Sequence, residues 1–157
     1  LAPILKAMGA RILYNATAEK NLEDAEFCEL DQLLSAVDIL SLHIPLTPDT
    51  TNLIDAASFK RMKQGAVLVN TSRGGVVDQD ALIKALKFGP LRAAGLDVFA
   101  TEPLPIDDPL LKLDNVTLTP HLGWLTSETL KRSITVAVEN CVRLRDGKEL
   151  LHYVSAN

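Results

Sequence analysis

The residues Asn70-Thr71-Ser72-Arg73-Gly74-Gly75 form a polar turn between an apolar run and a predicted helix start. The run before them, residues 66–69, has the composition of a buried strand, and Asp78 after them can cap a helix. In an open α/β sheet, ligands bind beyond the carboxyl ends of the strands. An arginine there can grip a carboxylate or phosphate with its planar fork. Arg73 is therefore a candidate ligand-binding residue, and a surface arginine in a tight turn is the alternative interpretation.

Strand-like and helix-like segments alternate along the rest of the chain. The expected strands are residues 11–14, 37–42, 66–70, 93–96 and 115–119, and the expected helices are residues 1–8, 29–36, 55–61, 79–88 and 127–145. This alternation predicts an α/β fold with a Rossmann-like, doubly wound and mostly parallel sheet that carries helices on both faces.

A dinucleotide-binding domain of this kind opens with a strand, a Gly-x-Gly-x-x-Gly turn and a helix, whereas this chain begins inside the helix. We therefore expect residues 1–157 to be a partial dinucleotide-binding domain that lacks the first strand and the glycine-rich turn, with the substrate domain absent from this chain. The absent strand lies in the middle of the usual order, so two half-sheets are expected. Without the helix N-terminus that holds a pyrophosphate, the stretch alone is expected to bind dinucleotide poorly.

The composition narrows the classes of partner. The chain has 157 residues, 20 acidic against 16 basic residues and a net charge of −4. Because Lys and Arg do not cluster, nucleic acid is not an expected partner, and no apolar run approaches the ~20 residues of a membrane span. Cys28 and Cys141 lack metal-ligand spacing and are interpreted as reduced core or near-core thiols, which favours a cytoplasmic protein with no metal site.

Polar side chains follow each expected strand at its carboxyl end, and parallel strands place these ends along one edge of the sheet. They are Asn15, His43, Arg73, Asp97 with Glu102 shortly after it, and His121. An arginine, a carboxylate and a histidine beside a nucleotide crevice indicate carbonyl reduction. The arginine would orient an acid substrate, the histidine would exchange a proton with the oxygen, and the carboxylate would hold the imidazole in one tautomer. A nicotinamide cofactor would supply hydride.

Four motifs, in order and at matching spacing, resemble the D-isomer-specific 2-hydroxyacid dehydrogenases, and the likeness is to their glyoxylate/hydroxypyruvate reductases. The motifs are residues 42–47, residues 69–78, residues 95–99 together with 102–105, and residues 119–123. The resemblance covers essentially the whole chain. It implies NAD(P)-dependent reduction of a small 2-keto acid, such as glyoxylate or hydroxypyruvate, or the reverse oxidation of the 2-hydroxy acid. It also implies a homodimer.

The resemblance further implies a role for each matching residue. Arg73 would bind the substrate carboxylate and carbonyl, His121 would be the general acid/base, and Glu102 would be its partner. Asp97 would hold the nicotinamide carboxamide, and Gly123 would leave room beside the nicotinamide. The full expected cofactor-binding set is Asn15, His43, Ile44, Pro45, Thr71, Ser72, Arg73, Asp97, His121 and Gly123.

Several of these residues have a structural alternative. His121 could contact only local backbone, Glu102 could be a solvated loop acid, and Asp97 could merely cap a turn. For His43 a structural role and a cofactor contact are both open. Trp124 departs from the small residue or tyrosine expected at its position, and its role is not assigned.

Asn15 bears on the choice of cofactor. Enzymes that use NAD usually place an acid at this strand end to accept hydrogen bonds from the ribose, whereas enzymes that use NADP avoid that acid and often add an arginine. Asn15 is neutral and no arginine follows it closely, so NAD is expected and NADP stays open. Two readings compete with an enzyme: a non-enzymatic NAD(H) sensor resembling the corepressors of the same superfamily, and an inactive fragment.

Overall fold

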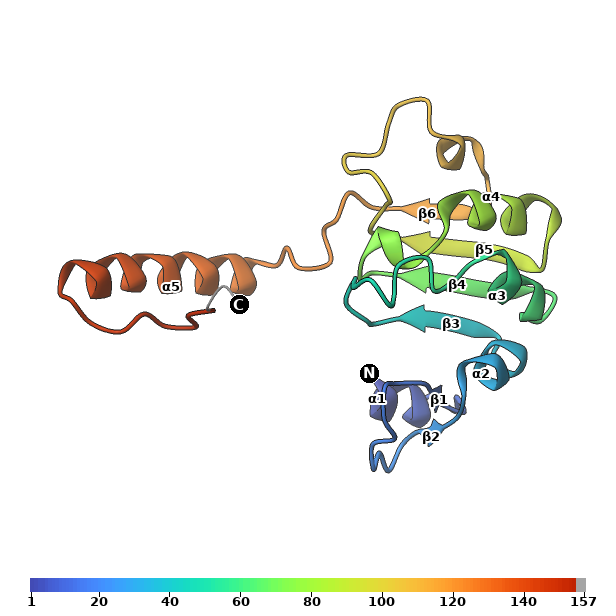
Figure 1. Cartoon of the computed structure of the whole chain (residues 1–157), viewed down its shortest axis with the longest axis horizontal. Coiled ribbons are helices and arrows are strands. Elements are labelled where there is room, and N and C mark those ends of the chain that lie inside the picture. Colours follow the sequence, from blue (N-terminus) through green and yellow to red (C-terminus); the bar gives the residue numbers. More distant parts are fainter. Residues whose placement is uncertain (155–157) are drawn as a thin grey trace. The chain divides into compact units, whose positions relative to one another are not determined.

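The computed structural model describes residues 1–154, which form two compact units, Leu1–His121 and a second unit that begins at Leu122 (Figure 1). The first unit contains two parallel sheets. The larger sheet has the order β3 (Ile39–Leu42), β4 (Ala66–Asn70), β5 (Leu91–Leu96) and β6 (Val116–Leu118), and the smaller sheet pairs β1 (Leu13–Tyr14) with β2 (Glu26–Phe27). The predicted α/β class with a parallel sheet and the expected pair of half-sheets are both confirmed.

Within residues 1–154, one α-helix precedes the first strand, three connect successive parallel strands and one follows the last strand. They are α1 (Ala2–Ala7), α2 (Leu30–Ala36), α3 (Ala56–Arg61), α4 (Gln79–Phe88) and α5 (Ser127–Arg145), with short 3-10 helices η1 (Gly74–Val76) and η2 (Pro109–Lys112). Asp55 and Asp78 cap α3 and α4 by accepting hydrogen bonds from the backbone N–H groups of Ser58 and Ala81. The strand β2 was not predicted, because two residues offer no periodicity to read.

The strands of the larger sheet end in register. Asn70 at the end of β4 lies opposite Leu42 of β3 on one side and Leu96 of β5 on the other, and Leu96 pairs with Leu118 of β6. The loops after the four strands therefore leave from the same edge of the sheet, where ligands bind in folds of this class.

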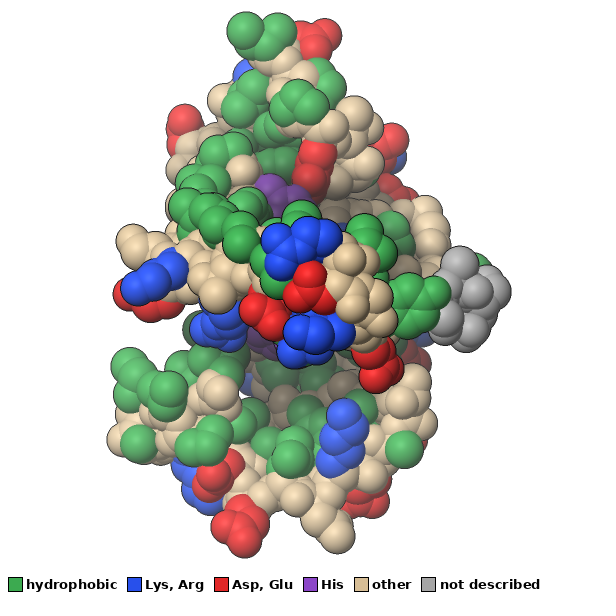
Figure 2. Space-filling view, turned by 90° about the vertical axis from the view of Figure 1, so that its left-hand side faces the viewer, with side chains coloured by type: hydrophobic (Ala, Val, Ile, Leu, Met, Phe, Trp, Pro, Cys, Tyr) green, Lys and Arg blue, Asp and Glu red, His purple; other side chains and the backbone are tan. Residues whose placement is uncertain are grey.

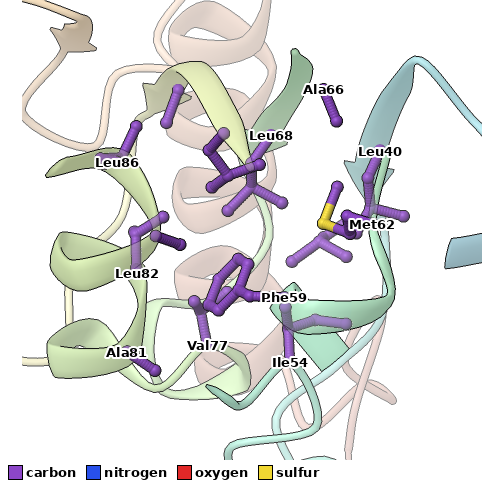
Figure 3. Close-up of a cluster of buried hydrophobic side chains, with 14 of the residues drawn as sticks. Leu40, Ile54, Phe59, Met62, Ala66, Leu68, Val77, Ala81, Leu82 and Leu86 are labelled. Atoms are coloured by element: carbon purple, nitrogen blue, oxygen red, sulfur yellow. The ribbon is translucent and has the colours of Figure 1, made fainter. Parts of the chain in front are cut away.

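The core lies between this sheet and the helices α3 and α4, which pack on the same face of it (Figure 3). Leu68 of β4 and Ile54 before α3 are fully buried, and Phe59 of α3 and Leu82 of α4 are nearly so. Burial of each such side chain contributes roughly 1.5–3 kcal/mol. On the opposite face of the sheet the side chains of β3 are exposed and those of β4 are half-buried.

The second unit consists mainly of α5. Its cap is Thr126, whose hydroxyl accepts a hydrogen bond from the Thr129 N–H, and Gly147 follows its end with a φ of 65°. No residue of α5 is buried, so the expectation that Cys141 is a core or near-core thiol is wrong. Cys28 is half-buried, and both cysteines are free thiols. Cys141 is exposed, and most apolar side chains of α5, such as Ile134 and Leu144, are exposed with it.

Acidic and basic side chains are interspersed on the face shown in Figure 2, and neither kind forms a continuous patch there. No helix within residues 1–154 is long and apolar enough to cross a membrane. The same residues contain no group of three or more His, Cys, Asp and Glu side chains arranged to hold a metal ion.

Candidate active site

The buried side chain of Asn70 stabilises the turn that carries Arg73 through hydrogen bonds. The Asn70 side chain is 1% exposed; its Oδ1 accepts hydrogen bonds from Ser72 N and Oγ at 3.1 and 2.9 Å, and its Nδ2 donates to the Arg73 carbonyl at 3.0 Å. Both polar ends of the amide are therefore satisfied, as a buried amide requires. The Arg73 guanidinium is exposed and donates to the Ser72 carbonyl at 2.7 Å, so it is open to a ligand from solvent.

Gly74 lets this turn approach the loop that follows β5. A Cβ at Gly74 would lie 1.9 Å from the carbonyl carbon and oxygen of Phe99 and 2.6 Å from Ala100 N. No side chain fits in that space. A Cβ at Gly75 would meet the Leu46 side chain at 3.0 Å, so the loop after β3 also lies against the turn.

Glu102 and His121 form a direct pair. His121 Nδ1 donates to Glu102 Oε2 at 2.8 Å, and the other carboxylate oxygen, Oε1, accepts from Phe99 N at 2.9 Å. These two hydrogen bonds hold the pKa of Glu102 below its ordinary value, with the bond from His121 contributing most, and the charge of nearby Arg73 lowers the pKa further. The carboxylate is therefore charged, which fixes Nδ1 as the protonated ring nitrogen and leaves Nε2 for chemistry.

The backbone of His121 adopts a φ of 54°, which is unusual for a residue with a side chain. Its N–H donates to the carbonyl of Thr119, the residue after β6. The direction of the imidazole thus depends on a tight bend directly after β6.

Asp97 lies at the end of β5, between the ends of β4 and β6. Its side chain is 5% exposed and accepts a short hydrogen bond from the Thr119 hydroxyl, and its N–H donates to the Asn70 carbonyl. A buried carboxylate at the sheet edge is a suitable acceptor for an amide N–H of a ligand.

Two of the predicted residues are held away from this group. The Asn15 amide donates to the Cys28 carbonyl at 3.0 Å and so bridges the ends of β1 and β2 in the other sheet. The exposed His43 pairs through Nε2 with Ser41 Oγ at 2.8 Å. Among the described contacts, neither residue touches Arg73, Glu102 or His121, and the cofactor contacts expected of both stay predictions.

The other predicted cofactor-binding residues lie on two loops at the same edge. Ile44 is half-buried and packs against the core, whereas Pro45 and Thr71 are exposed. The Pro45 carbonyl accepts from the Thr50 hydroxyl at 2.7 Å, which closes the loop after β3. Gly123 and the half-exposed Trp124 belong to the second unit.

The sequence matches one family model over residues 1–123, described as the NAD binding domain of D-isomer specific 2-hydroxyacid dehydrogenases. The chain belongs to this family. The resemblance stated from the four motifs is thereby confirmed.

Members of the family are similar over nearly the whole chain. A glyoxylate reductase from Korarchaeum cryptofilum is 48% identical over 148 residues, 91% of this chain and 44% of its own length. A D-lactate dehydrogenase with NAD⁺ from Lactobacillus jensenii has a TM-score of 0.87 at 32% identity, over 99% of this chain and 51% of its own. A D-isomer specific 2-hydroxyacid dehydrogenase from Xanthobacter autotrophicus Py2 in complex with NADPH and MES has a TM-score of 0.80 at 35% identity, over 98% and 64%. The chain spans about 44% of the length of the glyoxylate reductase.

Sequence reasoning missed two residues that shape this dehydrogenase-family site. Asn70 was noted only as part of the turn. Side chains alternate between the two faces of a strand, and Asn70 lies on the same face as the buried Ala66 and Leu68, so the pattern predicts an inward, hydrogen-bonded amide. Gln79 was interpreted only as the first residue of a helix. No sequence signal indicates its contacts, because they reach a loop more than 20 residues away.

Proposed function

We propose that the protein transfers hydride between a nicotinamide cofactor and a small 2-keto or 2-hydroxy acid, with Arg73, Glu102 and His121 as its catalytic residues. The observation that carries the proposal is the hydrogen bond between Glu102 and His121, with the positive charge of Arg73 close enough to lower the carboxyl pKa. The close approach of Gly74, next to Arg73, to Phe99 and Ala100 also supports placing a cationic anchor, a proton donor and its carboxylate partner in one site.

Each residue has a physical role in the reduction of the keto acid. The Arg73 guanidinium would bind the substrate carboxylate in a bidentate manner and hold the carbonyl beside the histidine. His121 Nε2 would donate a proton to the carbonyl oxygen, and the charged Glu102 would stabilise the imidazolium and fix its tautomer. The cofactor, when bound, supplies hydride to the carbonyl carbon. In the oxidation direction His121 accepts the hydroxyl proton.

The loops at the carboxyl edge of the sheet fit a nicotinamide cofactor. The buried Asp97 carboxylate could accept an N–H of the carboxamide, and Thr71 and Ser72 lie on the turn beside it. The loop of His43, Ile44 and Pro45 would then face the adenine end. We propose NAD as cofactor, with NADP as the alternative, because related structures contain NAD⁺ in one case and NADPH in another.

We also propose that the chain is a partial dinucleotide-binding domain, with a further strand between β1 and β3 in the whole protein. Two separate parallel sheets, and a length of about 44% of a relative, support this domain assignment. We propose a cytoplasmic homodimer for the whole protein; the free thiols of Cys28 and Cys141 support a reducing compartment, and the family likeness supports the dimer.

The test is NADH consumption by the full-length protein with glyoxylate or hydroxypyruvate. His121→Asn is expected to lower turnover by about 10²–10⁴-fold, the typical contribution of a general acid, and Arg73→Lys is expected mainly to raise KM because the bidentate fork is lost.

The variants His152→Asn and Arg92→Lys repeat the same chemical changes at positions outside the site and should leave turnover unchanged. NADH binding without consumption, tried across 2-keto acids, would support a sensor instead of an enzyme.

A further inference from the structure

Gln79, the first residue of α4, makes two hydrogen bonds to the loop that carries Glu102. Its Oε1 accepts from Ala100 N at 3.2 Å, and its Nε2 donates to Asp108 Oδ2 at 2.9 Å. One planar amide thus contacts the loop near its beginning and again at its end, six residues beyond Glu102. The two contacts use the acceptor and the donor of the same side chain.

The loop needs such an anchor because it has few others. After Phe99 its side chains are largely exposed, with Ile106 at 96%, and only Leu104 packs partly against the core before Leu110 is buried in η2. Glu102 is bound inside the loop to Phe99 N and outside it to His121, so its own bonds do not fix the loop independently of the pair.

Gln79 is itself held firmly. Asp78 caps α4 and donates its own N–H to the Ile54 carbonyl, and Ala81 and Leu82 in the first turn of the helix are buried. A cavity of about 10 Å³ is lined by Gln79 together with Asn70, Gly74 and Phe99. Gln79 therefore lies where the Arg73 turn, the Glu102 loop and α4 meet.

We propose that Gln79 is a positioning residue: by binding Ala100 and Asp108 it fixes the loop so that the Glu102 carboxylate meets the His121 ring. Its importance for turnover rests on the proposed function, whereas its effect on the pair follows from the contacts alone. Asp108 is part of the same anchor, because its other oxygen, Oδ1, accepts from Leu110 N at 2.8 Å at the start of η2.

The first test measures the pKa of the Glu102 carboxyl by NMR titration in the full-length protein. Gln79→Met keeps the length of the side chain and removes both hydrogen bonds. We expect the pKa of Glu102 to rise toward the ordinary carboxyl value, because a mobile loop weakens the bond with His121. Lys84→Ala, an exposed change in the same helix, is the control and should leave that pKa unchanged.

The second test exchanges donor and acceptor. Gln79→Glu keeps an acceptor for Ala100 N but places a second carboxylate against Asp108, so it is expected to disturb the loop. In the double variant Gln79→Glu/Asp108→Asn, residue 108 carries the amide and donates to the carboxylate of residue 79, which restores the hydrogen bond between them. The amide oxygen of residue 108 still accepts from Leu110 N at the start of η2. Rescue of the Glu102 pKa by the double variant supports a specific contact and does not depend on whether Gln79→Met folds.

In the full-length protein, Gln79→Met is expected to lower turnover by roughly tenfold or more, as misplaced catalytic groups do, and the double variant should recover most of it. An unchanged Glu102 pKa in both single variants, or no recovery in the double variant, would overturn the proposal. If the unmodified protein shows no turnover but Gln79→Met still changes the pKa of Glu102, the proposed function is contradicted and the positioning role of Gln79 is not.

Discussion

Gly74 is the residue at which the turn of Arg73 contacts the loop that carries Glu102. The Phe99 carbonyl occupies the space that any Cβ at this position would need. The contact is with backbone, so no change of rotamer can relieve it. The close approach of these two segments therefore requires a residue without a side chain at position 74.

Gly74→Ala is expected to destabilise the protein by about 1–3 kcal/mol or more, the usual cost of overpacking. Urea denaturation would measure the loss in free energy of unfolding. Gly95→Ala is the matched control, because a Cβ there meets nothing within 4 Å and should be neutral or slightly stabilising. Equal stability of the two variants would mean that the turn and the loop can separate without cost.

At this scale the sequence predicted residues with distinctive chemistry better than residues with ordinary chemistry. Glu102 and His121 were expected to pair, and Glu102 Oε2 lies 2.8 Å from His121 Nδ1. Their roles in catalysis stay predictions. Asn70 and Gln79 were missed because an amide in a turn or at a helix start looks like any other, and its importance comes from contacts that only the folded chain creates.

At the scale of elements, α4 connects the core to the site. Asp78 caps it by accepting from Ala81 N at 3.0 Å, its buried side chains pack on the sheet, and its first residue binds the Glu102 loop. A weak helix start would therefore loosen the loop as well as the core.

Asp78→Ala is expected to cost about 1 kcal/mol in unfolding free energy, the typical loss for an N-cap. Asp80→Ala, in the first turn but exposed and without a capping bond in the described structure, should cost less, since only its interaction with the helix dipole is removed. Thermal or urea unfolding of both variants would give the difference. A loss at Asp80 as large as at Asp78 would assign the effect to charge and not to the cap.

The predicted elements agree best with the structure where local signals are strong. The strand Ala66–Asn70 and the helices Gln79–Phe88 and Ser127–Arg145 have the bounds that were expected, because a continuous apolar run marks the strand, and capping residues, helical periodicity and glycines mark the helices. The two-residue strand Glu26–Phe27 was missed, because its parallel partner β1 defines it and its own residues do not.

At the scale of the whole molecule, acid stability depends on carboxylates that the fold keeps charged. The pKa of Glu26 is lowered by its hydrogen bond from Arg11, that of Asp55 by the Ser58 N–H, and that of Glu102 by His121. A folded pKa below the unfolded one gives stability that is present above the unfolded pKa and is lost as pH falls through the folded pKa.

The urea midpoint is therefore expected to fall as pH drops below about 4, the ordinary range of carboxyl groups. Asp55→Asn keeps a capping oxygen and removes one titrating group, so its acid loss should be smaller than that of the unmodified protein. Midpoints measured from pH 7 to pH 2.5 would test this, and identical pH profiles for the two proteins would contradict the role given to Asp55.

The mostly parallel sheet was predicted from the alternation of strands and helices, because parallel strands need long crossover connections that are usually helical. The family was predicted from four sequence motifs, and the match of residues 1–123 to the family model confirms it. The exposure of the apolar face of α5 could not be read from sequence, because its 3.6-residue periodicity predicts a covered face without saying what covers it.

The contact between Gly74 and the Phe99 carbonyl also restricts how this protein can tolerate genetic change. A second mutation that alters only the side chain of Phe99 cannot compensate for a bulkier residue at position 74, because the clash is with the peptide group. Intragenic suppressors of such a mutation should instead be insertions or deletions that alter the path of the loop. Among related sequences, we therefore expect the turn at Gly74 and the loop after Phe99 to change together in length and not in residue type.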